Sequence, residues 1–514
     1  MTPDLPTLLA CEWEDLLYVA PDPASDFFAD GGHSLLAARL FTRLSSALGR
    51  DLDPTLVFRH PNFADLLIAI GDATGRPAAE VVGTGNDGSL PLTATQRSVL
   101  SKRAARESSG LPASPFTLPL RMLRFTGDTP TAAAVSAALA ALVSRQPALR
   151  LRFSPTLDSA QIEDRATPGE AELSVVKLAA DPGPDAAAAT LLPLAEQPFG
   201  LDESPRLRAG YLHSPTAAYF GLTLDHLVSD GHSGDLALRQ IIDELSGVGR
   251  IDNAAENSQN RHALEQFVHQ ANALEDSPEF VGHLAYWRAA LGDQVVPTTA
   301  LLGAPGFTPN LRAQPLRITE DLGEHGLRSL KQAAANWRVS AFAVLLAATW
   351  LATRDLVGTA EAAVTPIANR GQQGLENLIA FCSHAVVRPA PQQLPTVLRT
   401  AAAAAMEQLR ESAEHECVPH PTLIRHLAPE QHGHTRTRPW LFLNVTLGKD
   451  LPSPVEEPDV VPLWWNNTML ALEITDDGGR LRLTVTAGAD CARPDELTAL
   501  ARAVARHLDT ASDS

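Results

Sequence analysis

The hydrophobic pattern of the chain changes character near residue 76, and this change limits its fold more than any other feature. Residues 1–75 alternate short helical patterns with turn signals. Residues 76–92 (RPAAEVVGTGNDGSLPL) lose this periodicity and gather Gly, Pro, Asn and Asp, which is typical of a linker. Beyond residue 90, strand patterns mix with helical ones. The 514 residues therefore divide into a small helical domain and a larger α+β region, and a single small domain is excluded.

The first segment is expected to be a helical bundle with a long first loop. Apolar residues recur at helical spacing in two stretches, and a shorter third stretch follows Pro61. The periodic residues are Leu8, Leu9, Trp13, Leu16 and Leu17, then Leu36, Leu40, Leu44 and Leu48, then 62–70. The first 80 residues hold 12 Asp and Glu against 5 Lys and Arg. A small acidic domain thus precedes a less acidic one.

Composition excludes several classes of protein. A formal net charge of −19 and a pI near 5.3 disfavour binding to the phosphate backbone of nucleic acid. The sequence has no run of about 18 apolar residues that would span a bilayer, and its start lacks the basic region of a secretory signal. The four cysteines are widely spaced without a C-x-x-C pair, which fits a reducing compartment. We expect a cytoplasmic protein that binds neither nucleic acid nor a membrane.

The larger region repeats one combination of strands and Ala-rich helices. The first set comprises a strand at 116–127, a helix at 131–146 with Thr131 at its cap, and strands at 207–213 and 217–228. The second set comprises a helix at 340–354 and strands at 361–367, 440–447, 469–475 and 480–488. The polar stretch 251–260 is the expected crossing between them. We predict two α+β halves in tandem, at 90–255 and 256–514, after a helical domain at 1–75 and a linker at 76–89.

A first candidate site lies in the sequence DFFADGGHSLL, at residues 26–36. Two glycines and a histidine precede Ser34, which opens the second helical stretch. Free backbone N–H groups behind the serine hydroxyl would tolerate an anionic group attached to it. By spacing alone, a plain helix N-cap serine accounts for the same pattern.

This segment resembles the phosphopantetheine attachment motif of carrier-protein (thiolation) domains in nonribosomal peptide synthetases. The resemblance extends to VFRHPNFADL (57–66), which is similar to the start of the last helix in that family. It implies an all-α four-helix carrier in which a phosphopantetheinyl transferase attaches a 4′-phosphopantetheine arm to Ser34. Such an arm keeps its cargo at high effective concentration, which is a delivery function. His33 matches carriers that serve condensation.

A second candidate site lies in LTLDHLVSDGHS, at residues 222–233. His226 stands at the expected end of a strand, with Asp225 before it and Asp230 after it. A carboxylate can fix the tautomer of such a histidine, which makes it a candidate general base. Taken alone, the same histidine also fits a surface position or a satisfied structural one.

The stretch resembles the His-His-x-x-x-Asp-Gly motif of nonribosomal peptide synthetase condensation domains. Other segments match that family in the same order: 90–100, 144–153, 198–212, 285–292, 365–370, 376–387, 415–424 and 438–445. The resemblance covers roughly residues 89–514 and implies a chloramphenicol-acetyltransferase-like pseudodimer, with the site in a tunnel between two lobes. The whole chain would then be an all-α carrier followed by an α+β pseudodimer.

The resemblance implies a role for each matching residue. His226 would position the acceptor amine or remove its proton as it attacks a thioester. Asp230 would be structural and pair with Arg370, in the segment TPIANR. Gly231 would let the backbone approach the reacting carbonyl. Asn444 is a weaker candidate for the tunnel wall.

Asp225 stands where the family has its first histidine. That histidine is regarded as supporting, so we expect transfer activity to survive the change. Asp225 would either raise the basicity of His226 or redirect its usual hydrogen bond. His232 also stands where a bulky aromatic residue is common, which alters the expected tunnel lining.

Two further patterns carry little functional weight. The sequence HECVPH (415–420) places histidines five residues apart with a proline between them, so they cannot share a helical face and bind a metal as in H-E-x-x-H. Cys382 and Cys417 lack a basic neighbour in sequence that would indicate a nucleophile. No metal site is expected.

The leading hypothesis is a monomeric acyl-transferring enzyme with its own upstream carrier. An upstream adenylation or synthetase module would supply the donor, and a downstream carrier or a free small amine would be the acceptor. Three alternatives remain open: a silent domain that recruits a tailoring enzyme to the carrier-bound peptide, an epimerase, and an ester-forming variant. The sequence does not identify donor or acceptor.

Overall fold

The computed structural model describes residues 4–513 with internal gaps. The gaps comprise residues 18, 29, 31, 33, 51, 74–88, 109, 111–115, 127–128, 164–172, 248–252, 303–314, 369, 371–373, 432–439, 448–468 and 489–491. His33 and residues 76–88 of the expected linker lie outside the described residues.

The first segment folds as the predicted helical bundle. Its helices are α1 (Leu5–Leu17), α2 (Ser34–Leu48), α3 (Leu56–Arg59) and α4 (Phe63–Asp72). The five periodic residues of α1 are all buried. Trp13 lies at the centre, with its ring edge-on to Phe27 at 5.3 Å and to Phe63 at 5.5 Å. Asn62 caps α4 by accepting hydrogen bonds from the N–H groups of Ala64 and Asp65.

The next part of the chain is a first α+β lobe. Its elements are β1 (Ser89–Pro91), α5 (Ala94–Ser108), β2 (Arg121–Thr126), α6 (Ala132–Arg145), β3 (Leu151–Phe153), β4 (Ser159–Ile162), β5 (Leu173–Lys177), α7 (Pro184–Leu191), β6 (Leu207–His213), β7 (Ala217–Leu224), α8 (Gly231–Ser246) and α9 (Asn253–Ala273). The main sheet has the order β2-β7-β6-β5, and β1-β4-β3 form a small second sheet. Every residue of β7 is buried, so both faces of this strand are covered. Thr131 caps α6, as predicted.

The stretch expected to cross between the lobes is largely helical. The boundary placed between residues 255 and 256 falls inside α9, which begins at Asn253. Apolar residues of α9, among them Leu264 and Phe267, pack into the hydrophobic cluster of the first lobe. By packing, α9 therefore belongs to the first lobe, and polar residues of its first turns contact Arg145 and Arg150 of that lobe.

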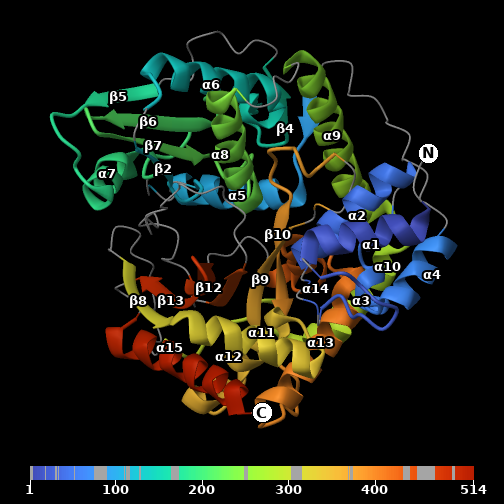
Figure 1. Cartoon of the computed structure of the whole chain (residues 1–514). Helices are drawn as coiled ribbons and strands as arrows, with labels where there is room; N and C mark the ends of the chain where they lie inside the picture. Colours follow the sequence, from blue (N-terminus) through green and yellow to red (C-terminus); the bar gives the residue numbers. More distant parts are fainter. Residues whose placement is uncertain are drawn as a thin grey trace.

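A second α+β lobe follows. Its elements are α10 (Phe280–Leu291), β8 (Pro315–Leu322), α11 (Gly323–Trp337), α12 (Ala341–Val357), β9 (Ala363–Ala368), β10 (Ser383–Arg388), α13 (Leu398–Ser412), α14 (His420–Leu427), β11 (Trp440–Thr446), β12 (Met469–Asp477), β13 (Arg480–Gly488) and α15 (Pro494–Asp509). The sheet has the order β10-β9-β11-β12-β13-β8. Figure 1 shows the two lobes above one another, each with its own sheet and helices.

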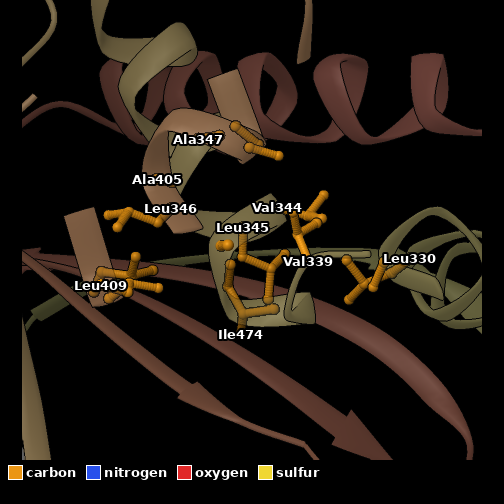
Figure 2. Close-up of a cluster of buried hydrophobic side chains, with 14 of the residues drawn as sticks. Leu330, Val339, Val344, Leu345, Leu346, Ala347, Ala405, Leu409 and Ile474 are labelled. Carbon is orange, nitrogen blue, oxygen red and sulfur yellow. The ribbon is translucent and has the colours of Figure 1, made fainter. Parts of the chain in front are cut away.

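Helix α12 is the centre of the second core. Ser340 caps its start and Gly358, with a φ of 82°, ends it, and most residues between them are buried. Figure 2 shows its side chains, including Leu345 and Leu346, packed between Ile474 of the sheet and Leu409 of α13. No single described helix is long and apolar enough to cross a membrane. Helices α11 and α12 pass that test only together, with a bend of 104° between them.

The helical bundle lies against the second lobe. Helix α3 contacts α13 (Figure 1), and the apolar cores of the bundle and of the second lobe form one continuous cluster. Arg59 at the end of α3 pairs with Glu414, just beyond α13, at 3.0 Å. This contact places the bundle beside the turn that precedes α14.

Candidate functional site

Ser34 is the first residue of α2, as the sequence predicts. The loop before it is tied to the rest of the bundle: the Phe27 N–H donates to the Pro61 carbonyl at 2.8 Å, and Asp26 pairs with Asn62 in an isolated antiparallel bridge. The start of α2 is therefore held by the segment that leads into α4. A helix start offers unpaired N–H groups to an anion such as a phosphate.

Gly32 makes this loop possible. A Cβ atom at position 32 would come within 2.3 Å of the Phe27 ring, so the backbone passes too close to that ring for any other residue. Its N–H donates to the Phe27 carbonyl at 2.7 Å. The side chain of Trp13 donates to Asp30 at 3.1 Å and holds the same loop from α1. These contacts fix the loop that leads into α2.

His226 occupies the turn after β7. Its N–H donates to the carbonyl of Phe116 at 2.8 Å, and its ring lies parallel to the Phe116 ring at 4.6 Å. The Phe381 ring, which comes from the second lobe, lies 4.8 Å from the imidazole. The imidazole is thus held between aromatic rings from distant parts of the chain.

One contact fixes the tautomer of His226. Its Nδ1 lies 2.7 Å from the carbonyl oxygen of Ser229, and a carbonyl can only accept, so Nδ1 carries the proton. The neutral ring therefore has an unprotonated Nε2. Burial lowers the pKa of His226, and the opposing effects of the Ser229 carbonyl and Asp230 do not overcome it. The imidazole is a neutral proton acceptor near pH 7.

The carboxylate of Asp225 takes no part in the hydrogen bond of His226. One oxygen accepts from Arg206 at 2.8 Å and the other from the N–H of Leu227 at 2.9 Å. Both members of the pair are buried, and Arg206 also donates to the carbonyls of Leu151 and Gly200. Burial raises the pKa of Asp225 and lowers that of Arg206, with their mutual attraction opposing both shifts. Asp225 therefore anchors the turn, and it does not make His226 more basic than a free histidine.

Asp230 and Arg370 join the two lobes. Arg370 donates to Asp230 at 2.7 Å, which is the pairing that the resemblance implies, and both side chains are buried. Asp230 also caps α8 by accepting from the N–H of Ser233 at 3.0 Å. Burial opposes ionisation of Asp230, yet Arg370 and Ser233 hold its pKa below the ordinary value. Arg370 in turn donates to the carbonyls of Leu375, Leu378 and Ala380.

The segment from Leu375 to Cys382 therefore reaches from the second lobe into the first. Its apolar residues belong to the hydrophobic cluster of the first lobe. Gln146 donates to the carbonyl of Asn377 at 2.9 Å, and His232 contacts the carbonyl of Glu376 at 2.8 Å. His232 thus serves the lobe contact.

Four further residues of this site have no role predicted from the sequence. They are Phe116, Arg206, Ser233 and Phe381, which supply the ring stack, the partner of Asp225, and two contacts across the lobes. Arg206 lies 19 positions before Asp225, one strand earlier in a hairpin. Arg206, Ser233 and Phe381 lie in the segments 198–212, 222–233 and 376–387 that resemble the family, and this placement is the signal that points to them.

Gly231 and Asn444 complete the candidate set. Gly231 is the exposed first residue of α8, and a Cβ atom there would meet nothing within 4 Å. Its lack of a side chain is thus not needed for packing. Asn444 is half-buried on β11, opposite Glu473 of β12. It lies in the sheet of the second lobe, whereas His226 follows β7 of the first.

Comparison with known proteins identifies the two parts of the chain. A family profile described as "Condensation domain" matches residues 116–459, and one described as "Phosphopantetheine attachment site" matches residues 7–70. The chain belongs to the condensation-domain family. It carries a phosphopantetheine attachment domain before the condensation domain, in the order that the sequence predicts.

Relatives of the chain include very large synthetases. Cyclosporin synthetase simA of Tolypocladium inflatum is 28% identical over 395 residues, which cover 74% of this chain and 2% of that protein. The N-(5-amino-5-carboxypentanoyl)-L-cysteinyl-D-valine synthase of Amycolatopsis lactamdurans is 25% identical over 443 residues, which cover 85% of this chain and 12% of that protein. The chain thus spans only a small part of these relatives.

Solved structures share the fold. The cyclization-docking bidomain of EpoB from Sorangium cellulosum superposes with a TM-score of 0.67 at 16% identity, over 92% of this chain and 91% of that chain. The first condensation domain of the calcium-dependent antibiotic synthetase gives 0.66 at 16%, over 84% and 97%. The X-domain in complex with OxyB from teicoplanin biosynthesis gives 0.63 at 21%, over 86% and 97%. The condensation fold of two α+β lobes is thereby established.

The Arg206–Asp225 pair predicts a coupled pattern of stability. Arg206→Met or Asp225→Asn alone leaves an uncompensated partner in the core, so each is expected to cost about 3–5 kcal/mol in the free energy of unfolding. The double variant removes both charges and is expected to cost clearly less than the sum. Urea denaturation of the four proteins measures this cycle. Costs that simply add would show that the two side chains are not coupled.

Proposed function

We propose that the condensation domain transfers an acyl or peptidyl group from the carrier to an acceptor amine and forms an amide. The observation that carries this proposal is the orientation of His226. Its Nδ1–H is committed to the Ser229 carbonyl, which leaves Nε2 as a proton acceptor at the junction of the lobes. Membership in the condensation-domain family supports the same reaction class.

The carrier supplies the donor. We propose Ser34 as the residue that a phosphopantetheinyl transferase modifies, because it begins α2 behind the fixed loop of Gly32. When bound, phosphopantetheine supplies a flexible thiol that holds the acyl group as a thioester. The residues of the bundle present that attachment point and hold it beside the second lobe through Arg59 and Glu414.

His226 acts on the acceptor. Its Nε2 orients the amine through a hydrogen bond and takes a proton from it as the amine attacks the thioester carbonyl. Phe116 and Phe381 hold the ring in place and keep water from one part of its surface. A fixed ring loses no entropy during the reaction, which favours the transition state.

The other candidate residues position this base. The Asp230–Arg370 pair fixes the start of α8 against the second lobe, and Asp225 with Arg206 fixes the turn that carries His226. Gly231 leaves open space at the start of α8, where the reacting carbonyl approaches. Asn444 contributes to the wall of the tunnel between the lobes, on the side of the second lobe.

The partners follow from the arrangement. An upstream adenylation or synthetase module would supply the acyl group, and a downstream carrier or a free small amine would be the acceptor. We place the carrier at residues 1–75, the linker at 76–89 and the first lobe from residue 90. The first lobe extends through α9, because that helix packs into its core.

A second candidate is recruitment of another enzyme to the carrier-bound peptide. Asp225 in place of the first motif histidine favours it, as does the shared fold of the X-domain, which was solved in complex with OxyB. His226, with its fixed tautomer and its aromatic contacts, argues for chemistry instead. The first candidate predicts that an amine is converted to an amide, whereas the second predicts binding of another enzyme without such a product.

The reaction is tested with a preloaded carrier. Ser34→Ala is expected to abolish phosphopantetheine attachment, seen as the loss of the corresponding mass increase.

With the loaded protein and a panel of amines, His226→Ala is expected to slow amide formation by about 10²–10⁴-fold, measured by mass spectrometry. His213→Ala, on β6 away from this turn, is the control and keeps the rate. An unchanged rate of amide formation with His226→Ala would contradict the role of His226 as proton acceptor. Specific binding of a tailoring enzyme, with no amine converted to an amide, would favour recruitment.

The lowered pKa of His226 predicts an unusual acid limit. A proton acceptor works when it is unprotonated, so a folded-state pKa below the ordinary value of about 6.5 moves the acid limb of the rate to lower pH. Single-turnover transfer to an amine of low basicity is expected to stay flat down to pH values below about 6.5. Phe116→Ala exposes the ring and moves the limb upward. An acid limb above the ordinary histidine value in the unmodified protein contradicts this assignment.

Gly231 offers a clean test of approach to the site. Gly231→Ala meets no neighbour within 4 Å, so unfolding stability is expected to change little while transfer falls by about tenfold or more. Gly221→Ala is the contrasting variant, because its Cβ would come within 2.9 Å of Leu191 and destabilise the first lobe. Urea denaturation and single-turnover rates separate the two effects. Full activity of Gly231→Ala would remove Gly231 from the site.

A further inference from the structure

A cysteine and two histidines form a chain of contacts in the second lobe. The Sγ atom of Cys417 lies 3.6 Å from Nε2 of His283, and Nδ1 of His283 lies 2.9 Å from Nδ1 of His415. His283 belongs to α10, whereas the other two lie in the turn between α13 and α14. Cys417 and His283 are 134 residues apart in the sequence.

Neighbouring groups hold this chain in one orientation. The ring of Tyr286 stacks on His415 at 4.1 Å and 15°, and the indole N–H of Trp287 donates to the His415 carbonyl at 2.8 Å. Burial and the nearby His283 lower the pKa of His415, so its ring is neutral and can accept a hydrogen bond. When His283 donates through Nδ1–H to His415, its Nε2 is left to accept the proton of the Cys417 thiol.

The geometry does not suit a metal. Nδ1 of His283 faces His415, whereas Nε2 faces Cys417. A single metal ion bound to one of these nitrogens could therefore not also bind both Cys417 and His415. Within the described ranges, no group of three or more His, Cys, Asp or Glu residues is arranged to hold a metal ion. A thiol beside an oriented imidazole is instead the arrangement of an activated nucleophile.

The thiol lies next to the contact with the carrier. The carboxylate of Glu414 pairs with Arg59 of α3 at 3.0 Å, and the backbone carbonyl of Glu414 lies 3.7 Å from the Cys417 Sγ atom. Glu414 therefore contacts both Arg59 of the carrier and the Cys417 thiol. A phosphopantetheine carrier presents thioesters, and a thiolate can exchange its acyl group with a thioester.

We propose that Cys417 is a second acyl-accepting thiol, which exchanges acyl groups with thioesters at the carrier-facing edge of the second lobe. His283 takes the proton of the Cys417 thiol, and the sulfur attacks the thioester carbonyl carbon. A new carbon–sulfur bond to Cys417 forms, and the original thioester carbon–sulfur bond breaks. The departing thiolate takes the proton from His283, so no oxidant or further reactant is required.

Two other cysteines provide internal standards. Cys11 is exposed on α1, and no imidazole contact to it is found in the described part of the chain. Cys382 is buried, and burial raises the pKa of its thiol to about 12, so it is expected to stay inert. Half-buried Cys417 should react faster than exposed Cys11, which is the reverse of the order that exposure alone would give.

The test measures acyl transfer from a small thioester, S-acetyl-N-acetylcysteamine, to each cysteine. The full-length His226→Ala variant is used, so the result does not depend on amide formation or on loading of Ser34. Peptide mass spectrometry follows acetylation of Cys417 and Cys11 over time. A free thiol is only a few per cent ionised near pH 7, whereas His283 is placed to take the proton of the Cys417 thiol. We therefore expect Cys417 to react about tenfold faster than Cys11.

His283→Gln is expected to remove this excess and leave Cys11 unchanged, with folding checked by circular dichroism. His415→Gln, which keeps the Cys417–His283 contact but loses its orientation, is expected to give an intermediate rate. If a histidine variant unfolds, the ratio between Cys417 and Cys11 in the parent protein still decides. Equal rates at the two cysteines, or an excess that survives loss of His283 in a folded protein, overturn the proposal.

A second arm identifies the source of the thioester and rests on the proposed function of the carrier. The carrier is loaded with an acyl group, and the acylation of Cys417 is followed in the same way. Arg59→Glu is expected to slow this reaction at equal loading by at least several-fold, because it places two acidic groups opposite each other. The same variant should leave the reaction with the small thioester unchanged. Acylation by the small thioester alone would exclude the carrier as the source.

Discussion

The buried ion pair between Asp230 and Arg370 is the interaction on which the rest of this molecule depends. It joins the two lobes, because one partner begins α8 of the first lobe and the other follows β9 of the second. Two buried charges are tolerated when they are paired and hydrogen-bonded, and Arg370 also donates to Ser233 and to three backbone carbonyls. The segment that supplies those carbonyls also brings Phe381 to His226. The lobe contact and the candidate site are therefore built from the same hydrogen bonds.

The departure at Asp225 is accommodated by a second buried pair. Arg206 supplies the opposite charge from the neighbouring strand, and the turn between Asp225 and Ser229 is closed by hydrogen bonds at both ends. Asp225 thereby helps to hold the turn that carries His226. Burial of the ring, and not the adjacent carboxylate, sets the direction of its pKa shift.

The carrier contacts the second lobe close to the Cys417 thiol. The continuous apolar cluster and the Arg59–Glu414 pair hold the carrier beside α13. An exposed ion pair contributes little stability, so the packing provides most of the attachment and the charges provide orientation. The oriented thiol of Cys417 lies at the same edge. The Cys417 thiol and the contact with the carrier therefore lie at one edge of the second lobe.

The sequence by itself determined the order of the parts, because the change of periodicity, the motif around Ser34 and the motif around His226 depend only on neighbouring residues. The cap at Thr131 and the buried face of α1 were predictable for the same reason. The polar start of α9 led to the prediction of a crossing there, whereas in the structure these polar residues contact Arg145 and Arg150 of the first lobe. Only the tertiary structure placed Arg206 against Asp225 and His283 against Cys417. Contacts between residues far apart in the chain depend on how strands and helices pack, and local patterns do not encode that packing.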